Sequence, residues 1–146
     1  MSNFYPTVWN ILHDGIIVAI EGEVPGSIRL HVSIDYLRER FSDSGDTIQI
    51  LLAGCTRFAY REFDTNAFTT DLAVIAAMEP EVLSATLTDG LCEVECAGGM
   101  LEVAAVDGWV SLDSGRSVTL QELVGVSEAY WKQWSERAKQ ARQKPS

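Results

Sequence analysis

The sequence has few basic residues and no long apolar run, and both shortages exclude classes of function. Eleven Lys and Arg stand against 21 Asp and Glu, a formal net charge of −10. A field of this sign repels nucleic-acid phosphates and anionic membrane surfaces, which argues against both as partners. The longest stretch without a charged or strongly polar side chain is the seven residues 72–78, whereas a membrane-spanning helix needs about 20.

Targeting signals and paired cysteines are also scarce. The first residues carry no basic region followed by an apolar stretch, so the sequence predicts no secretory signal and a cytoplasmic protein. Of three cysteines, Cys92 and Cys96 are closest, but four residues along a strand separate them by about 13 Å. A disulfide needs Cα atoms within about 7 Å. We therefore expect reduced, buried thiols.

What remains is the composition of one globular domain spanning residues 1–146. The chain is 47% hydrophobic, and a domain of this length buries roughly 68–70% of its unfolded surface without disulfides or a structural metal. No cofactor is expected.

Turn residues between apolar runs predict a mainly β protein. Asp14-Gly15 predicts a hairpin between strands at 9–13 and 16–23, because type I′ turns need positive φ at both central residues. Strict apolar and polar alternation predicts a strand over 28–36, ending at Tyr36. A more buried strand is expected at 47–53, with Gly54 marking a bulge or bend before 56–60.

Glycines at 90, 99 and 108 recur every nine residues and predict a four-stranded meander. Its strands are expected at 82–88, 91–96, 100–106 and 109–112. Residues 70–78 fit either a strand or a short helix that Thr70 or Asp71 caps and Pro80 terminates; helix is the favoured interpretation.

A long helix is predicted at the C-terminus. Thr119 and Glu122 form a capping box, and Val118 with Leu123 forms the matching hydrophobic staple. The helix is expected over about 120–140, followed by a frayed tail at 141–146. The predicted fold is therefore mainly β (α+β): a bent antiparallel sheet or small barrel of seven or eight strands over about 9–112, with this helix packed on it.

Charge is divided unevenly along the chain. Before Glu128 there are 6 basic and 19 acidic residues, and from Glu128 onward 5 basic and 2 acidic. Basic residues near a helix C-terminus complement the helix dipole. Alternatively, the basic tail pairs with an acidic partner or with the acidic body of another copy.

The candidate interaction residues lie on the predicted C-terminal helix: Tyr130, Trp131, Trp134 and Arg137. Trp, Tyr and Arg are the residue types that dominate binding hot spots. We nevertheless expect Trp131 and Trp134 to be buried on the sheet, because an amphipathic helix at a chain end needs a surface to cover.

No pattern predicts a catalytic, cofactor-binding or metal-binding residue. His13 and His31 lack metal-ligand spacing, and any site that combines them with Cys92 and Cys96, or pairs His31 with Cys55, depends on the tertiary fold. The glutamates at 93, 95 and 102 alternate with apolar residues, as on a solvated sheet face.

Several motifs carry a resemblance: His13-Asp14-Gly15-Ile16, Gly22, Pro25-Gly26, the alternating strand to Tyr36-Leu37-Arg38, Leu52-Ala53-Gly54-Cys55 and Tyr130-Trp131. Together they resemble a group of small bacterial proteins of uncharacterised function that is similar to a variant of the Sm-like barrel fold. The resemblance implies assembly through strand edges. It carries over no RNA-binding residue, because Leu52-Ala53-Gly54 lacks the Arg-Gly of the second Sm motif and no helix is expected before Trp9.

These observations favour a non-enzymatic protein-interaction or assembly module, either self-associating into a homo-oligomer or acting as an acidic immunity-type inhibitor that attracts a basic protein. One alternative is an Sm-like RNA-binding protein, whose basic face would have to come from five arginines: Arg29, Arg38, Arg40, Arg57 and Arg61. A small enzyme without a recognisable motif is the other alternative.

Overall fold

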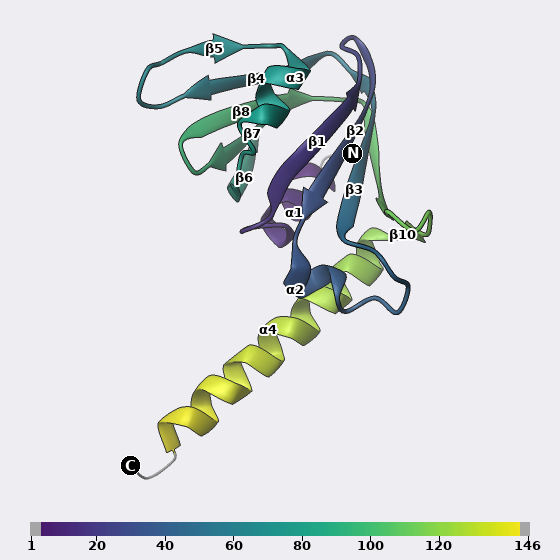
Figure 1. Ribbon diagram of the computed structural model, residues 1–146, viewed down its shortest axis with the longest axis vertical. Helices are drawn as coiled ribbons and strands as arrows, with labels where there is room; N and C mark the ends of the chain where they lie inside the picture. Colours follow the sequence, from purple (N-terminus) through teal and green to yellow (C-terminus); the bar gives the residue numbers. More distant parts are fainter. Residues whose placement is uncertain (1–3, 144–146) are drawn as a thin grey trace.

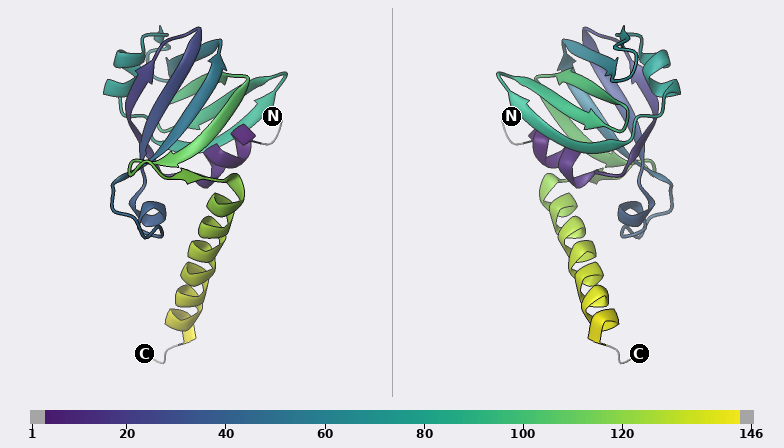
Figure 2. Two further views of the ribbon diagram at one scale, coloured as in Figure 1. Left: turned by 90° about the vertical axis from the view of Figure 1, so that its right-hand side faces the viewer. Right: turned by 90° about the vertical axis from the view of Figure 1, so that its left-hand side faces the viewer.

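The computed structural model describes residues 4–143, whose strands form two antiparallel five-stranded sheets around one hydrophobic core (Figures 1 and 2). In chain order the elements are α1 (Phe4–Ile11), β1 (Ile16–Gly22), β2 (Gly26–Ser33), α2 (Asp35–Arg38), β3 (Thr47–Cys55), β4 (Arg57–Glu62), β5 (Phe68–Thr69), α3 (Leu72–Ala77), β6 (Val82–Thr88), β7 (Leu91–Cys96), β8 (Gly99–Ala104), β9 (Asp107–Leu112), β10 (Ser117–Val118) and α4 (Leu120–Gln143). The first sheet has the order β1-β2-β3-β9-β10 and the second β5-β4-β8-β7-β6. A mainly β fold with a C-terminal helix is confirmed.

Two details of the predicted architecture are wrong. The structure has ten strands rather than seven or eight, because β5 and β10 are two residues each, too short to leave a periodic signal in the sequence. The sheets are not closed into a barrel. Between β1 and the chain entering β6 there is only an isolated bridge, Ile16 to Glu81.

The chain passes from one sheet to the other between β3 and β4, and it returns between β8 and β9. The two connections lie side by side. Ala53 pairs with Asp107 in the first sheet, and Arg57 pairs with Ala104 in the second. Gly54 has φ +60°, and a Cβ atom there would lie 2.8 Å from Cγ2 of Val106. The bend predicted at this glycine is confirmed.

The N-terminal segment is a helix, so the expected strand at 9–13 is wrong. Val8, Trp9 and Leu12 share one face of α1 and its extension and are fully buried. Pro6 lies in the first turn, where its missing N–H costs no helical hydrogen bond. Asp14-Gly15 therefore connects α1 to β1 rather than forming a hairpin.

The long alternating strand is shorter than predicted. Ile28, Leu30 and Val32 are buried along β2, as the alternation requires, but the strand ends at Ser33. The backbone N–H groups of Leu37 and Arg38 donate to Ile34 O, so the residues that follow form the helical turn α2. Tyr36 lies on this turn, because burying Leu37 and Arg38 together requires helical rather than alternating spacing.

The meander holds for three strands and fails for the fourth. β6, β7 and β8 are consecutive neighbours, and the turn between β6 and β7 has positive φ at both Asp89 and Gly90. β9 instead crosses to the first sheet and pairs with β3, so Asp107-Gly108 lies inside a strand. The preferred helix at 70–78 is confirmed as α3, capped by Asp71, whose Oδ1 accepts from the N–H of Ala73 at 3.0 Å.

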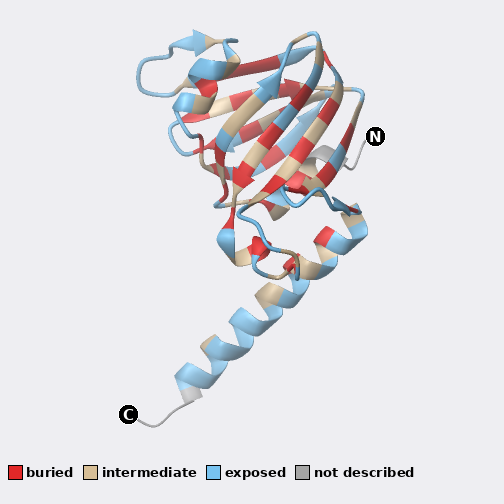
Figure 3. Ribbon diagram, turned by 45° about the vertical axis from the view of Figure 1, so that its right-hand side comes forward, coloured by how far each residue is buried: buried red, intermediate tan, exposed pale blue. Residues whose placement is uncertain are grey.

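The helix α4 begins as the capping box predicts and ends three residues later than expected. Thr119 Oγ1 accepts from the N–H of Glu122 at 3.0 Å, and Glu122 Oε1 accepts from the N–H of Thr119 at 3.2 Å. Figure 3 shows that buried residues on α4 are confined to its first turns. Residues 141–143, expected to fray, continue the helix, and residues 144–146 lie outside the described part.

Candidate functional site

The aromatic side chains of α4 pack against the turn after α1 and against α2, not against a sheet. The Trp131 ring stacks on His13 with centroids 5.2 Å apart and planes 19° apart. Tyr130 contacts Tyr36 at 4.6 Å between centroids. Trp134 touches Trp131 edge-on but remains 55% exposed. The prediction that Trp131 and Trp134 are buried on the sheet is therefore wrong, because α4 leaves the body at its base instead of crossing it (Figure 1).

A hydrogen bond joins two of the residues on which the base of α4 packs. Tyr36 Oη donates to His13 O at 2.8 Å. Burial, with the nearby charge of Asp14 and the phenol of Tyr130, raises the pKa of Tyr36 to about 12, so the phenol keeps the proton that it donates. The hydrogen bond joins α2 to the turn after α1, and Tyr130 and Trp131 of α4 pack against these two residues.

Beyond this contact α4 projects away from the body (Figures 1 and 2). We call residues 134–143 the arm. Arg40 lies over the Tyr130 ring and donates to Gln133 Oε1 at 2.7 Å, just before the arm begins. The described side chains of the arm make no hydrogen bond or ion pair with any described residue outside α4. Arg142, for example, donates only to Ala138 O within the helix.

The arm has the opposite charge to the body. Three basic residues, Arg137, Lys139 and Arg142, are exposed on it together with one acidic residue, Glu136. Exposed carboxylates lie on the elements at the helix base: Asp35 and Glu39 on and after α2, and Glu128 and Glu122, which pairs with Arg116, on α4 itself. One helix therefore joins an acidic end to a basic end.

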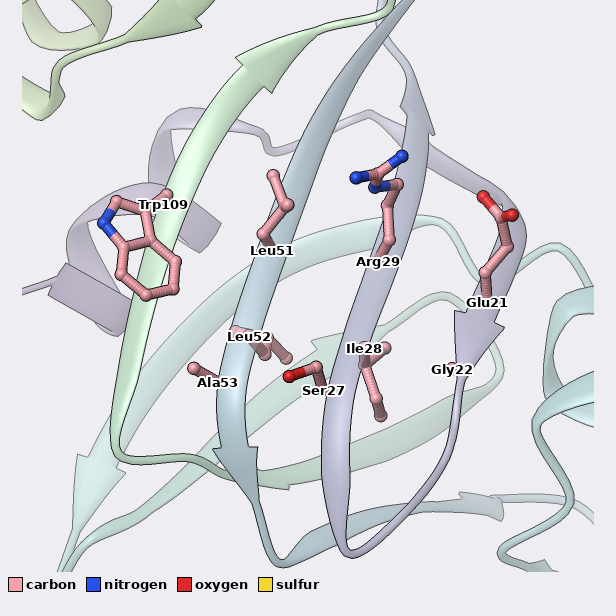
Figure 4. A pocket seen from close by; sticks show the side chains of 9 residues that line it. All are labelled: Glu21, Gly22, Ser27, Ile28, Arg29, Leu51, Leu52, Ala53 and Trp109. Carbon is pink, nitrogen blue, oxygen red and sulfur yellow. The ribbon is translucent and has the colours of Figure 1, made fainter.

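A second surface is the outer face of the first sheet, which sequence reasoning did not single out. Cross-strand pairing places Glu21, Arg29, Leu51 and Trp109 side by side on β1, β2, β3 and β9. Figure 4 shows the four side chains crossing the sheet in that order. We call them the Trp109 row; the indole of Trp109 is 53% exposed.

A parallel row of polar side chains lies next to it, formed by His31, Gln49, Ser111 and Ser117 on β2, β3, β9 and β10; we call these the Gln49 row. Ser111 Oγ donates to Gln49 Oε1 at 3.3 Å, and Gln49 Nε2 lies 3.4 Å from His31 Nδ1. Nε2 of the same histidine lies 2.5 Å from Glu21 Oε1. The hydrogen bond and the charge of His31 lower the pKa of Glu21.

Two depressions border these rows. The larger, of about 510 Å³, lies between Trp109 and Leu51 on one side and Gln49, Ser111 and Ser117 on the other. The smaller, of about 270 Å³, lies beyond the other side of the Trp109 row, toward Gly22 and Ala53. The alternation in β2 and β3 indicated which residues face outward, but only strand pairing brings Trp109 beside Arg29.

The five arginines of the RNA-binding alternative do not share a face. Arg29 lies on the first sheet and Arg57 and Arg61 on the second, where Arg57 pairs with Glu102 at 2.5 Å. Arg38 is buried against Asp113 at 2.9 Å. These five arginines therefore form no continuous basic surface.

Other candidate groups stay apart or are inaccessible. Cys55, Cys92 and Cys96 are free and buried, as expected. The described residues include no group of three or more His, Cys, Asp or Glu that could hold a metal ion. Within 4–143, no helix is long and apolar enough to cross a bilayer. Comparison with known proteins finds no matching family model, no matching curated protein and no matching solved structure.

Proposed function

We propose that this chain is a non-enzymatic assembly module that forms a two-fold dimer through antiparallel pairing of α4 helices. The observation that carries the proposal is the arm, residues 134–143, which leaves the body with a half-exposed Trp134. Isolated helices shorter than about 12–15 residues are marginal in water. A second helix lying alongside would supply the packing that the arm lacks within its own chain.

Charge selects the antiparallel orientation. In a parallel pair the basic arms would lie together and repel. In an antiparallel pair the arm of each copy runs toward the acidic base of the other, where Asp35, Glu39 and Glu128 are exposed. A two-fold axis at Ser135 places Arg142 opposite Glu128 of the second copy, since each is seven residues from the axis.

Trp134 supplies the apolar contact at the centre of this pair. Its ring lies one residue from the proposed axis, and two-fold symmetry would bring both copies of the ring into one interface. Exposed tryptophans with neighbouring arginines are the commonest hot spots of protein interfaces. Arg137 follows Trp134 by three residues and therefore lies on the same side of α4, one turn further along. Both belong to the interaction residues predicted from the sequence.

Dimer formation through the edge of a sheet is less well supported, because other groups already occupy the edges of β6 and β1. Asn10 Nδ2 donates to Ala85 O at 3.1 Å and Asn10 Oδ1 accepts from Ala85 N at 3.0 Å, which covers the outer edge of β6. Ile17 N donates to Pro80 O at 3.0 Å beside β1. We therefore place self-association at the arm rather than at a sheet edge.

The test is the mass of the full chain in solution, measured by light scattering and sedimentation over a range of concentrations. We expect a dimer, and Trp134→Ala should weaken it by about thirtyfold or more. A chain ending at Gln133 should be monomeric, whereas one ending at Gln140 should still dimerise. Trp109→Ala is the matched control, because it removes an equally exposed tryptophan outside α4.

Cysteine cross-linking tests the geometry directly. The native thiols are buried, so a single exposed cysteine dominates oxidation. Ser135→Cys, on the proposed axis, should form a disulfide with itself across the dimer, and Ala141→Cys should not. A chain that remains monomeric at every concentration, or that cross-links through Ala141→Cys but not through Ser135→Cys, overturns the proposal. A monomer that captures a basic protein would instead favour the immunity-type inhibitor.

A further inference from the structure

We propose that the outer face of the first sheet binds a neutral oligosaccharide, a chain of pyranose rings that stacks on Trp109 and hydrogen-bonds to the Gln49 row. This inference is independent of the dimer, because none of its residues lies on α4. It rests on the pairing of an apolar row and a polar row on one open sheet face.

The apolar half of the recognition comes from Trp109 and Leu51. They are direct neighbours on β9 and β3, and the indole of Trp109 is exposed to solvent. A pyranose ring has C–H groups on its flat faces, which lose contact with water when they stack on an aromatic ring. The exposed ring of Trp109 suits such a disc-shaped ligand.

The polar part of the recognition comes from side chains that hydrogen bonds with neighbouring side chains already orient. Gln49 lies between Ser111 at 3.3 Å and His31 at 3.4 Å, and His31 is held in turn by Glu21. A carboxamide has two donors and two acceptor lone pairs, so these contacts leave Gln49 able to donate and accept further. The hydroxyl groups at the rim of a sugar both donate and accept, and need partners of this kind.

Arg29 adds donors beside the stacking platform. Its guanidinium makes no ion pair or hydrogen bond with another side chain among residues 4–143, although it borders both depressions. The guanidinium offers five N–H donors and no acceptor, and so complements hydroxyl or ring oxygens. Ser117 contributes a hydroxyl at the far side of the larger depression.

Charge argues for a neutral ligand. The residues that line the two depressions include one cation, Arg29, and one anion, Glu21. The whole chain has a net charge of −10 and repels polyanions. The lining lacks the acidic cluster that a cation would need, so neither an anionic nor a cationic polymer complements it.

The shape of the site argues for a chain rather than a single sugar. The depressions of about 270 and 510 Å³ lie on opposite sides of the Trp109 row and share Arg29, Leu51 and Trp109. A ligand that fills both must cross the Trp109 row. An extended peptide fits less well, because peptide recognition by sheets uses main-chain groups at a strand edge, and the inner strands β2, β3 and β9 use theirs in the ladder.

The experiment is calorimetric titration of the full chain with neutral hexasaccharides at millimolar concentration: cellohexaose, xylohexaose, mannohexaose, maltohexaose and the hexamer of N-acetylglucosamine. Hexagalacturonate serves as the anionic comparison and a proline-rich hexapeptide as the peptide comparison. We expect at least one neutral hexasaccharide to bind and the other two ligands not to bind.

Three variants at Trp109 and Gln49 locate the site, and a fourth, at Trp134, separates it from the dimer. Trp109→Ala should weaken the binding by at least about tenfold, and Trp109→Tyr should restore most of it. Gln49→Ala should also weaken the binding. Trp134→Ala should leave it unchanged even where it abolishes the dimer, so the two proposals can fail separately. Absence of binding to all five neutral sugars, preference for hexagalacturonate or the peptide, or binding that survives Trp109→Ala overturns the inference.

Discussion

The buried Arg38 and the partly exposed Asp113 form an ion pair that joins the end of α2 to the residue after β9. Arg38 Nε and Nη2 both donate to Asp113 Oδ1, at 3.0 and 2.9 Å, and the arginine is only 2% exposed. Asp113 Oδ2 accepts from the backbone N–H groups of Asp46 and Thr47. The carboxylate, which follows β9, therefore holds together the end of α2 and the start of β3, both more than 60 residues earlier in the chain.

Asp113 should make stability fall in acid. Desolvation raises its pKa, but hydrogen bonds from Asp46 N, Arg38 and Thr47 N outweigh it and hold the pKa below the ordinary value of an aspartate. A lowered folded pKa contributes stability that is present above the unfolded pKa and is lost as the pH falls through the folded value. Asp113→Asn should cost about 2–4 kcal/mol at neutral pH, because it leaves Arg38 buried without its counter-charge.

Urea unfolding between pH 7 and pH 3 checks this, with Asp46→Asn as the control because that residue contributes its backbone N–H rather than its carboxylate. The variant Asp113→Asn should also show a weaker loss of stability below pH 4 than the parent chain. Equal acid dependence in parent and variant would contradict the prediction.

Asn10 should protect the outer edge of β6 from pairing with a strand of another chain. Its side chain makes two hydrogen bonds with the backbone of Ala85, which replace those of a neighbouring strand. Asn10→Ala should lower the free energy of unfolding by about 1–3 kcal/mol, since it leaves two backbone groups without partners. It should also increase aggregation on heating, which light scattering measures. Gln121→Ala, at an exposed position on α4, is the control and should have little effect.

Trp131 and Trp134 should differ in their effect on stability. Trp131→Ala removes the ring stacked on His13 and should cost about 2–3 kcal/mol, less than a fully buried tryptophan. Trp134→Ala should change the stability of the monomer by less than about 0.5 kcal/mol, because the ring is mostly exposed. Both are measured by urea unfolding of chains ending at Gln140 at low concentration. Equal losses would show that Trp134 also anchors α4 to the body.

The three thiols should be unreactive in the folded chain. Desolvation raises the pKa of Cys55, and raises the pKa of Cys92 and Cys96 to about 12. Because the thiolate is the reactive form, all three should resist a thiol reagent at pH 8 and react together after unfolding in urea. Rapid labelling of any one of them under native conditions would refute this.

Local patterns in the sequence determined the elements whose structure depends on nearby residues. The capping box at Thr119 and Glu122 predicts the start of α4, and Asp89-Gly90 predicts the turn between β6 and β7. Alternation identifies the buried side of β2 because one face of a strand must avoid water. Each of these signals arises from hydrogen bonds or burial within a few residues.

The tertiary structure decided what depends on residues far apart in the chain. The sequence of residues 9–13 predicts a strand, yet Trp9 becomes helical because α1 packs on β6. Pairing of β9 with β3 brings Trp109 beside Leu51 and Arg29, and no local pattern encodes that partner. The direction of α4 is set by contacts of Tyr130 and Trp131 with Tyr36 and His13. These contacts, made across a long stretch of sequence, hold the first half of the helix against the body and leave the arm free.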